Sequence, residues 1–180
     1  MEQAYGNGGW MLPVGLLSWL ATSEVRMWVY GLRPLYGVVR FLHLAGMTGF
    51  LGAVLVVDLR LLGLFQSSSL SPARSALAGM MHWGFGLTVV TGIALFLYNP
   101  LGAGLHSMFL PKLLLIALGV LHVHGIRGRE VMRTVPALRR AAAAASLVIW
   151  VGVVGASTWN HMERPVSINA ALRANSVGKE

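Results

Sequence analysis

The chain has 180 residues, of which 56% are hydrophobic and only 11% are charged, and its mean hydropathy is +0.66. Soluble domains carry about a quarter charged residues, so this composition excludes an ordinary soluble domain and indicates a single membrane domain. The net charge is +8, but no basic stripe with interleaved aromatic residues accompanies it, which argues against nucleic-acid binding. Cysteine is absent, so disulfides, cysteine-ligated clusters and thioether-bound heme are excluded as well.

Residues 1–34 form an N-terminal segment that we expect to lie in the membrane interface. Met11–Leu20 is apolar but only about half as long as a membrane span. A signal peptide would start with a basic region, whereas this chain carries Glu2. An uncleaved interfacial helix is therefore predicted, with a cleaved signal as the alternative. Its anchors would be the three tryptophans of the segment, Trp10, Trp19 and Trp28.

Four apolar segments follow, and each approaches the ~20 residues that a helix needs to cross a bilayer. They are Leu35–Val57, Ala76–Tyr98, Phe109–Ile126 and Ala141–Trp159. The apolar runs are continuous rather than alternating, which favours helices over strands. Ser71-Pro72 before the second segment and Asn99-Pro100 after it mark helix ends. The predicted fold is all-α: an integral membrane four-helix bundle over residues 35–162, preceded by the short interfacial helix. A polar C-terminal tail at 163–180 follows, which we expect to be loose or to dock a partner.

The basic residues of the loops predict the orientation. An even number of spans places both ends of the chain on one side of the membrane. The run from Arg127 to Arg140 is the densest basic cluster in a short loop, and such loops stay in the cytoplasm. We therefore expect a multi-pass protein of the bacterial inner (cytoplasmic) membrane with both termini in the periplasm.

Histidines supply most of the basic groups inside the predicted spans, where such groups are costly and usually functional. If consecutive helices alternate in direction, His43 and His161 lie near the outer face, and His82 and His122 near the inner face. Two pairs at two depths, on the order of 20 Å apart, are the pattern for two b-type hemes with two axial imidazoles each. His106, in a loop, is expected to be solvated.

The third helix offers two histidines, of which one can face the bundle interior. His122 and His124 point about 200° apart on a helix. We assign His122 as the ligand because its stripe includes Lys112, Leu115 and Gly119. His124 is the alternative.

Small and basic residues near the histidines agree with heme binding. A heme between helices needs room, which glycine provides. The glycines on the histidine faces are Gly46, Gly79, Gly86 and Gly119. Heme propionates need cations near the membrane surface. Arg40 and Arg164, each three residues from an outer ligand, are the predicted partners of the outer heme, and Arg74 and Arg127 those of the inner heme.

Phe41–Leu64, FLHLAGMTGFLGAVLVVDLRLLGL, resembles the first helix of a family of small bacterial membrane proteins of unassigned function, which carry HxxG, a hydrophobic run and DLRLLG. Residues 19–22 (WLAT), 82–85 (HWGF) and 111–115 (PKLLL) are similar to that family too. This resemblance implies no reaction. In helix count and histidine placement the chain is also similar to four-helix cytochrome b subunits and the diheme b561-like group, although b561 proper has six helices. That likeness implies heme b and electron transfer.

We therefore predict a diheme b-type cytochrome subunit that transfers electrons across the bilayer between a partner redox protein and quinone. The expected cofactors are two hemes b and a quinone. The expected partners are membrane lipid and a periplasmic or membrane redox subunit, and the chain could also form an oligomer. Two alternatives stay open. One is a copper or small-solute transporter, suggested by Met80-Met81-His82, and the other is a heme-free membrane anchor of a larger complex.

Overall fold

The computed structural model describes residues 12–64, 74–126 and 135–177, with the side chains of residues 12–64, 75–123 and 135–162. Every regular element within these ranges is a helix. The four long helices are α3 (Tyr36–Leu62), α4 (Arg74–Tyr98), α6 (Phe109–Ile126) and α8 (Pro136–Val177). They confirm that the fold is all-helical, and each coincides with one of the predicted apolar segments.

Local sequence sets where these helices end. Gly63 terminates α3 in the left-handed conformation, with φ 107°, and donates its N–H to the Arg60 carbonyl. Helix α4 stops before Asn99-Pro100, as predicted. The Asn99 side chain then caps the short helix α5 (Pro100–Gly104) by accepting a hydrogen bond of 3.0 Å from the Gly102 N–H. The predicted helix start at Ser71-Pro72 lies outside the described residues.

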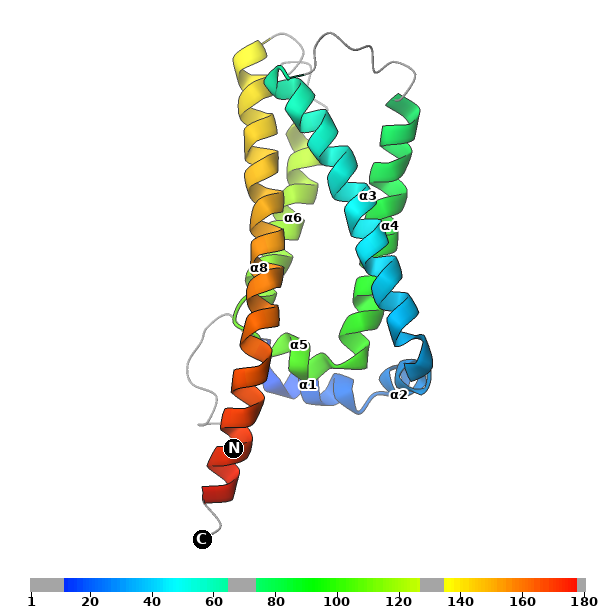
Figure 1. The fold of residues 1–180 in the computed structure, drawn as a ribbon, viewed down its shortest axis with the longest axis vertical. Helices are drawn as coiled ribbons and strands as arrows, with labels where there is room; N and C mark the ends of the chain where they lie inside the picture. Colours follow the sequence, from blue (N-terminus) through cyan, green and yellow to red (C-terminus); the bar gives the residue numbers. More distant parts are fainter. Residues whose placement is uncertain (1–11, 65–73, 127–134, 178–180) are drawn as a thin grey trace.

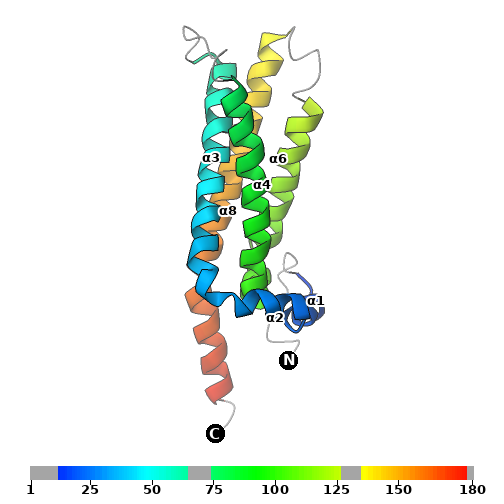
Figure 2. The ribbon, with the colours of Figure 1, turned by 90° about the vertical axis from the view of Figure 1, so that its right-hand side faces the viewer.

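The long helices lie side by side along the length of the molecule (Figures 1 and 2), with α3 packed against α4 and α8, and α6 against α8. The α3–α4 contact is close because two glycines face each other. A Cβ on Gly84 would lie 2.8 Å from the Gly46 carbonyl oxygen and 2.8 Å from the Phe50 nitrogen. Beside this contact the core consists of four buried residues, Phe50, Val54, Trp150 and Val153.

One aromatic contact fixes the relative height of residues on α3 and α8, which run antiparallel (Figure 1). The ring centroids of Phe50 and Trp150 lie 4.7 Å apart. One helical turn from this contact, Val54 is therefore level with Ser146, and two turns from it Asp58 is level with Ala142. In the other direction His43 is level with Ser157, one turn from His161.

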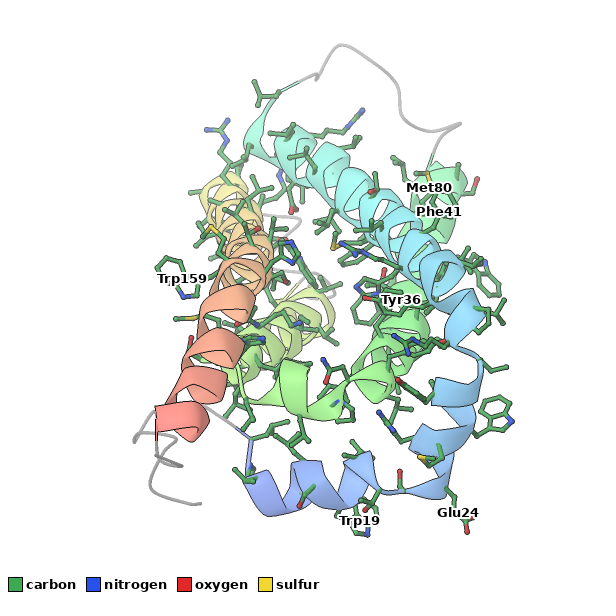
Figure 3. All side chains as sticks on the ribbon, turned by 60° about the horizontal axis from the view of Figure 1, so that its bottom comes forward. Trp19, Glu24, Tyr36, Phe41, Met80 and Trp159 are labelled. Carbon is green, nitrogen blue, oxygen red and sulfur yellow. The ribbon has the colours of Figure 1, made fainter. Side chains whose placement is uncertain are left out.

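Short helices lie across the end of the bundle where α3 begins (Figures 1 and 2). Two of them, α1 (Val14–Ala21) and α2 (Glu24–Gly31), replace the single N-terminal helix that was predicted, and η2 (Arg33–Leu35) leads into α3. Ser23 separates α1 from α2 because its hydroxyl caps α2 at the Arg26 N–H. Figure 3 shows Trp19 on the side of α1 that faces away from the long helices. Trp10 lies outside the described residues.

The chain after residue 162 differs from the prediction. A loose polar tail was expected, but α8 continues as a helix to Val177 and extends past the short helices (Figure 1). Pro165 has no N–H, so it removes one backbone hydrogen bond from this helix without ending it. The polar composition of residues 163–180 suggested a loose tail, but an exposed helix can be polar on every side.

Three helical stretches are long and apolar enough to cross a bilayer: Arg33–Leu62, Ser75–Tyr98 and Pro136–Met162. The apolar stretch Phe109–Val123 in α6 is shorter. Large apolar side chains cover the outside of these helices, as at Trp83, which is 83% exposed, and Val148, which is 72% exposed. Soluble monomers rarely expose apolar surface on this scale, so the arrangement is consistent with a membrane protein.

Candidate functional site

His43 is held against α4 by its Nδ1 atom. This nitrogen lies 3.0 Å from the Thr88 carbonyl oxygen and 3.1 Å from Thr91 Oγ1. A carbonyl oxygen can only accept, and the Thr91 hydroxyl donates its own hydrogen to the Leu87 carbonyl. Nδ1 therefore carries the imidazole hydrogen, and Nε2 keeps a free lone pair. Metal-binding histidines have this arrangement, in which one nitrogen donates to a carbonyl and the other binds the metal.

The surroundings of the His43 ring come from two other helices. A Cβ on Gly92 of α4 would lie 3.1 Å from His43 Cε1, so the absence of a side chain there lets the ring approach α4. Lys112 of α6 lies within electrostatic range of His43. The half-buried imidazole is thus oriented by α4 and lies near a cation on α6.

His161, the predicted partner of His43, is exposed on α8. The register of α3 and α8 puts the two histidines within one helical turn of the same height. Figure 1 shows α3 and α8 close at the end of α3 and well apart at its beginning, where His43 lies. Arg40 is exposed on α3, and the side chain of Arg164 lies outside the described residues.

His82 and His122 were predicted to share the second heme. His82 is exposed, and its Nδ1 donates to the Ala78 carbonyl of its own helix at 2.7 Å, which leaves Nε2 free. His122 is buried, and its Nε2 donates to the Ala142 carbonyl of α8 at 2.9 Å. An iron bound at His122 Nε2 would have to displace that hydrogen bond. In this geometry the His122 side chain links α6 to α8 by a hydrogen bond. The side chain of His124 lies outside the described residues.

The four predicted glycines divide into two that lie in close contacts and two that do not. A Cβ on Gly46 would lie 3.0 Å from the Gly84 oxygen, and one on Gly119 would lie 2.8 Å from Trp150 Cζ2. The space beside these two glycines is taken by α4 and by the Trp150 side chain. Gly79 and Gly86 have nothing within 4 Å of a built Cβ.

Two expectations about polar and metal-binding residues change. His106 is only 8% exposed, so the prediction that it is solvated is wrong: it lies in the turn between α5 and α6. Met80 and His82 are exposed, whereas Met81 packs against the core. The three residues of the copper hypothesis therefore point in different directions. Among the described residues, no group of three histidine, cysteine or acidic side chains could hold a metal ion.

Several polar residues of the interior were not among the residues predicted from the sequence. Thr88 and Thr91 are one turn apart on α4, a spacing that puts both on the face toward His43. Asp58 is fully buried on α3, and a carboxyl group inside an apolar run was the signal that could have identified it. Ser146 and Trp150 on α8 are buried as well.

No protein-family model, curated protein or solved structure matches this chain.

Proposed function

We propose that this chain is an integral membrane protein in which α3, α4, α6 and α8 all span the bilayer. The outward apolar faces and the lengths of α3, α4 and α8 support this proposal. Helix α6 has 18 residues, which gives about 27 Å at the usual rise and nearly matches the hydrocarbon thickness. The short helices α1 and α2 would then lie in the interface, with Trp19 and Trp28 exposed to headgroups.

Reporter fusions test this topology. We expect fusions at Ser107 and Glu180 to report the periplasm and a fusion at Arg133 to report the cytoplasm, because the basic loop stays inside. An alkaline phosphatase reporter would be active at the first two sites, and a fluorescent protein would be fluorescent at the third. If α6 does not span, Ser107 and Arg133 will report the same side, and the four-span proposal is then wrong.

Within this bundle we infer a site for heme b between α3 and α8, with His43 and His161 as axial ligands. One observation carries this inference: His43 donates Nδ1–H to the Thr88 carbonyl and leaves Nε2 free to bind iron. The helix spacing supports it as well. The backbones of α3 and α8 diverge toward the end that carries both histidines (Figure 1), and two imidazoles holding one heme would require helices farther apart than the about 8–10 Å of direct packing.

The second heme of the sequence prediction has less support. His82 has a free Nε2, but His122 uses its Nε2 to join α6 to α8. We therefore propose about one heme per chain, bound near the periplasmic face. A second heme would require His122 to leave the Ala142 carbonyl.

A heme bound in this way would supply a one-electron redox couple. The residues of the chain would hold and orient it. Thr88 and Thr91 fix the plane and tautomer of the His43 imidazole, and a heme held by two imidazoles would serve electron transfer rather than oxygen binding. Arg40 and Arg164 are the proposed partners of the propionates. We propose that the chain is an electron-transfer subunit serving a redox partner protein and quinone.

The absorption spectrum of the purified protein tests this function. Protein produced with sufficient heme supply should show the bands of a reduced b-type cytochrome, with about one heme per chain by the pyridine hemochrome assay. The same preparation should contain no stoichiometric copper, because Met80, Met81 and His82 do not converge. A colourless, folded protein would contradict the proposal and leave the membrane anchor as the better reading.

A further inference from the structure

A second polar region lies far from His43, where α3, α6 and α8 meet. It contains the junction residues Asp58, His122, Ser146 and Trp150. Asp58 and Ser146 are fully buried, and His122 and Trp150 are 8% and 6% exposed. A membrane interior offers no water to such groups, so each one needs a partner inside the protein.

Geometry brings these four residues together. His122 of α6 donates to the Ala142 carbonyl, and Asp58 of α3 is level with Ala142 by the register set at Trp150. Asp58 lies about 80° around α3 from Phe50, on the Val54 side and away from the glycine contact with α4. Ser146 follows Ala142 by one turn and precedes Trp150 by one turn. The carboxyl group and the imidazole thus approach the same part of α8.

Three buried donors on α8 have no hydrogen-bond partner within the described part of the chain: Arg139 Nε, Ser146 Oγ and Trp150 Nε1. The last two lie one helical turn apart. A serine inside a helix usually bonds the carbonyl four residues before it. For Ser146 that is the Ala142 carbonyl, which His122 already uses. Ser157 on the same helix follows the usual rule and bonds the Val153 carbonyl at 2.9 Å. An unsatisfied buried donor destabilises the folded protein, so two neighbouring ones require an explanation.

We propose that the junction residues enclose bound water. Water accepts from Ser146 Oγ and Trp150 Nε1, and it donates to the Asp58 carboxyl and to His122 Nδ1. His122 Nδ1 is an acceptor because Nε2 carries the hydrogen. A buried water with two to four polar partners is a common structural element, and here it joins α3, α6 and α8.

The mixture of donors and acceptors at the site favours water over an ion. A cation could not be bound by the Trp150 N–H, which only donates, and Arg139 on the same stripe of α8 would repel it. An anion would meet the Asp58 carboxyl group. Packing closes the site on the Trp150 side, because the Trp150 ring contacts Phe50 at 4.7 Å and lies against Gly119.

Thermal unfolding of the purified full-length protein tests the proposal, with Ser157 as the matched control. Ser146→Ala should lower the unfolding midpoint by about 2 °C or more relative to Ser157→Ala, since it removes one partner of the water. If no water were bound to the Ser146 hydroxyl, replacing the serine by alanine would remove an unsatisfied donor and raise the unfolding midpoint. A raised or equal midpoint therefore overturns the proposal.

A double-mutant cycle tests whether the groups share one water. His122→Gln keeps a donor for the Ala142 carbonyl but removes the Nδ1 acceptor. Its effect on the midpoint should be smaller in the Ser146→Ala background than in wild type, and unchanged in the Ser157→Ala background. Additivity in both backgrounds would contradict a shared water.

Replacing sodium by choline in the buffer tests for a bound cation. It should shift the unfolding midpoint of neither wild type nor Ser146→Ala. A sodium-specific stabilisation that is lost in Ser146→Ala would show a cation instead.

Discussion

Gly84→Ala should strongly destabilise the protein, whereas Gly86→Ala, two residues along the same helix, should not. An alanine Cβ at position 84 would lie 2.8 Å from two backbone atoms of α3, and neither atom can rotate away. The helices would have to separate, and overpacking of this kind costs about 1–3 kcal/mol. At position 86 a Cβ meets nothing within 4 Å. Alanine there should even favour the helix, by up to about 1 kcal/mol.

The yield of folded protein after detergent extraction and its unfolding midpoint would measure this difference. Gly84→Leu should leave little folded protein, and Gly86→Leu should behave like wild type. Equal midpoints for the two alanine variants would show that α3 and α4 do not meet at these glycines. The comparison cancels helix propensity, because both substitutions replace glycine in α4.

His43→Asn should abolish heme binding while the protein stays folded. Asparagine places an amide N–H where histidine has Nδ1–H, so the hydrogen bond to the Thr88 carbonyl survives. It has no atom at the position of Nε2, so the proposed iron ligand is lost. We expect heme affinity to fall more than the about 10–100-fold that is typical of losing an outer partner of a metal ligand. His161→Ala should affect the same heme.

Two variants serve as controls for this experiment. Thr91→Val should retain the heme but shift its midpoint potential, because the imidazole keeps Thr88 and loses one of its two acceptors. His122→Gln should retain the heme unchanged, since His122 binds the Ala142 carbonyl and not the proposed site. Full heme content in His43→Asn, or loss of heme in His122→Gln, would mean that the ligands have been assigned to the wrong helices.

Electron transfer through such a site would be confined to one half of the bundle. His43 with Thr88 and Thr91 lies toward the short helices, and the junction residues lie toward the other end of α3. Between them lie Phe50 and Phe85, whose ring centroids are 5.2 Å apart, and the Phe50 ring lies 4.7 Å from Trp150 of the junction. The two polar regions are therefore separated by aromatic packing, and variants in one region should leave the other intact.

The sequence by itself determined the secondary structure of the long helices. Runs of about 20 apolar residues favour helices in a membrane because every backbone polar group must be satisfied within its own segment. Local signals such as Gly63 and Asn99-Pro100 then fixed where α3 and α4 end, since capping and the missing proline N–H act over a few residues. Composition did not predict the break between α1 and α2 at Ser23, nor the helix that continues through residues 163–177.

The tertiary structure alone decided which side chains meet. The sequence gives the depth of each histidine along the bundle but not the direction in which its side chain points. This applies to His43, His82, His122 and His161. Only the packing of α3 on α4 turns His43 Nδ1 toward Thr88, and only the packing of α6 on α8 engages His122 Nε2. The tertiary structure also decides which glycines lie in close contacts. A Cβ at Gly46 or Gly119 would meet α4 or Trp150, whereas a Cβ at Gly86 would have no atom within 4 Å. Hydrogen bonds between helices depend on helix rotation, which a periodic apolar sequence leaves undetermined and which close packing of particular side chains fixes.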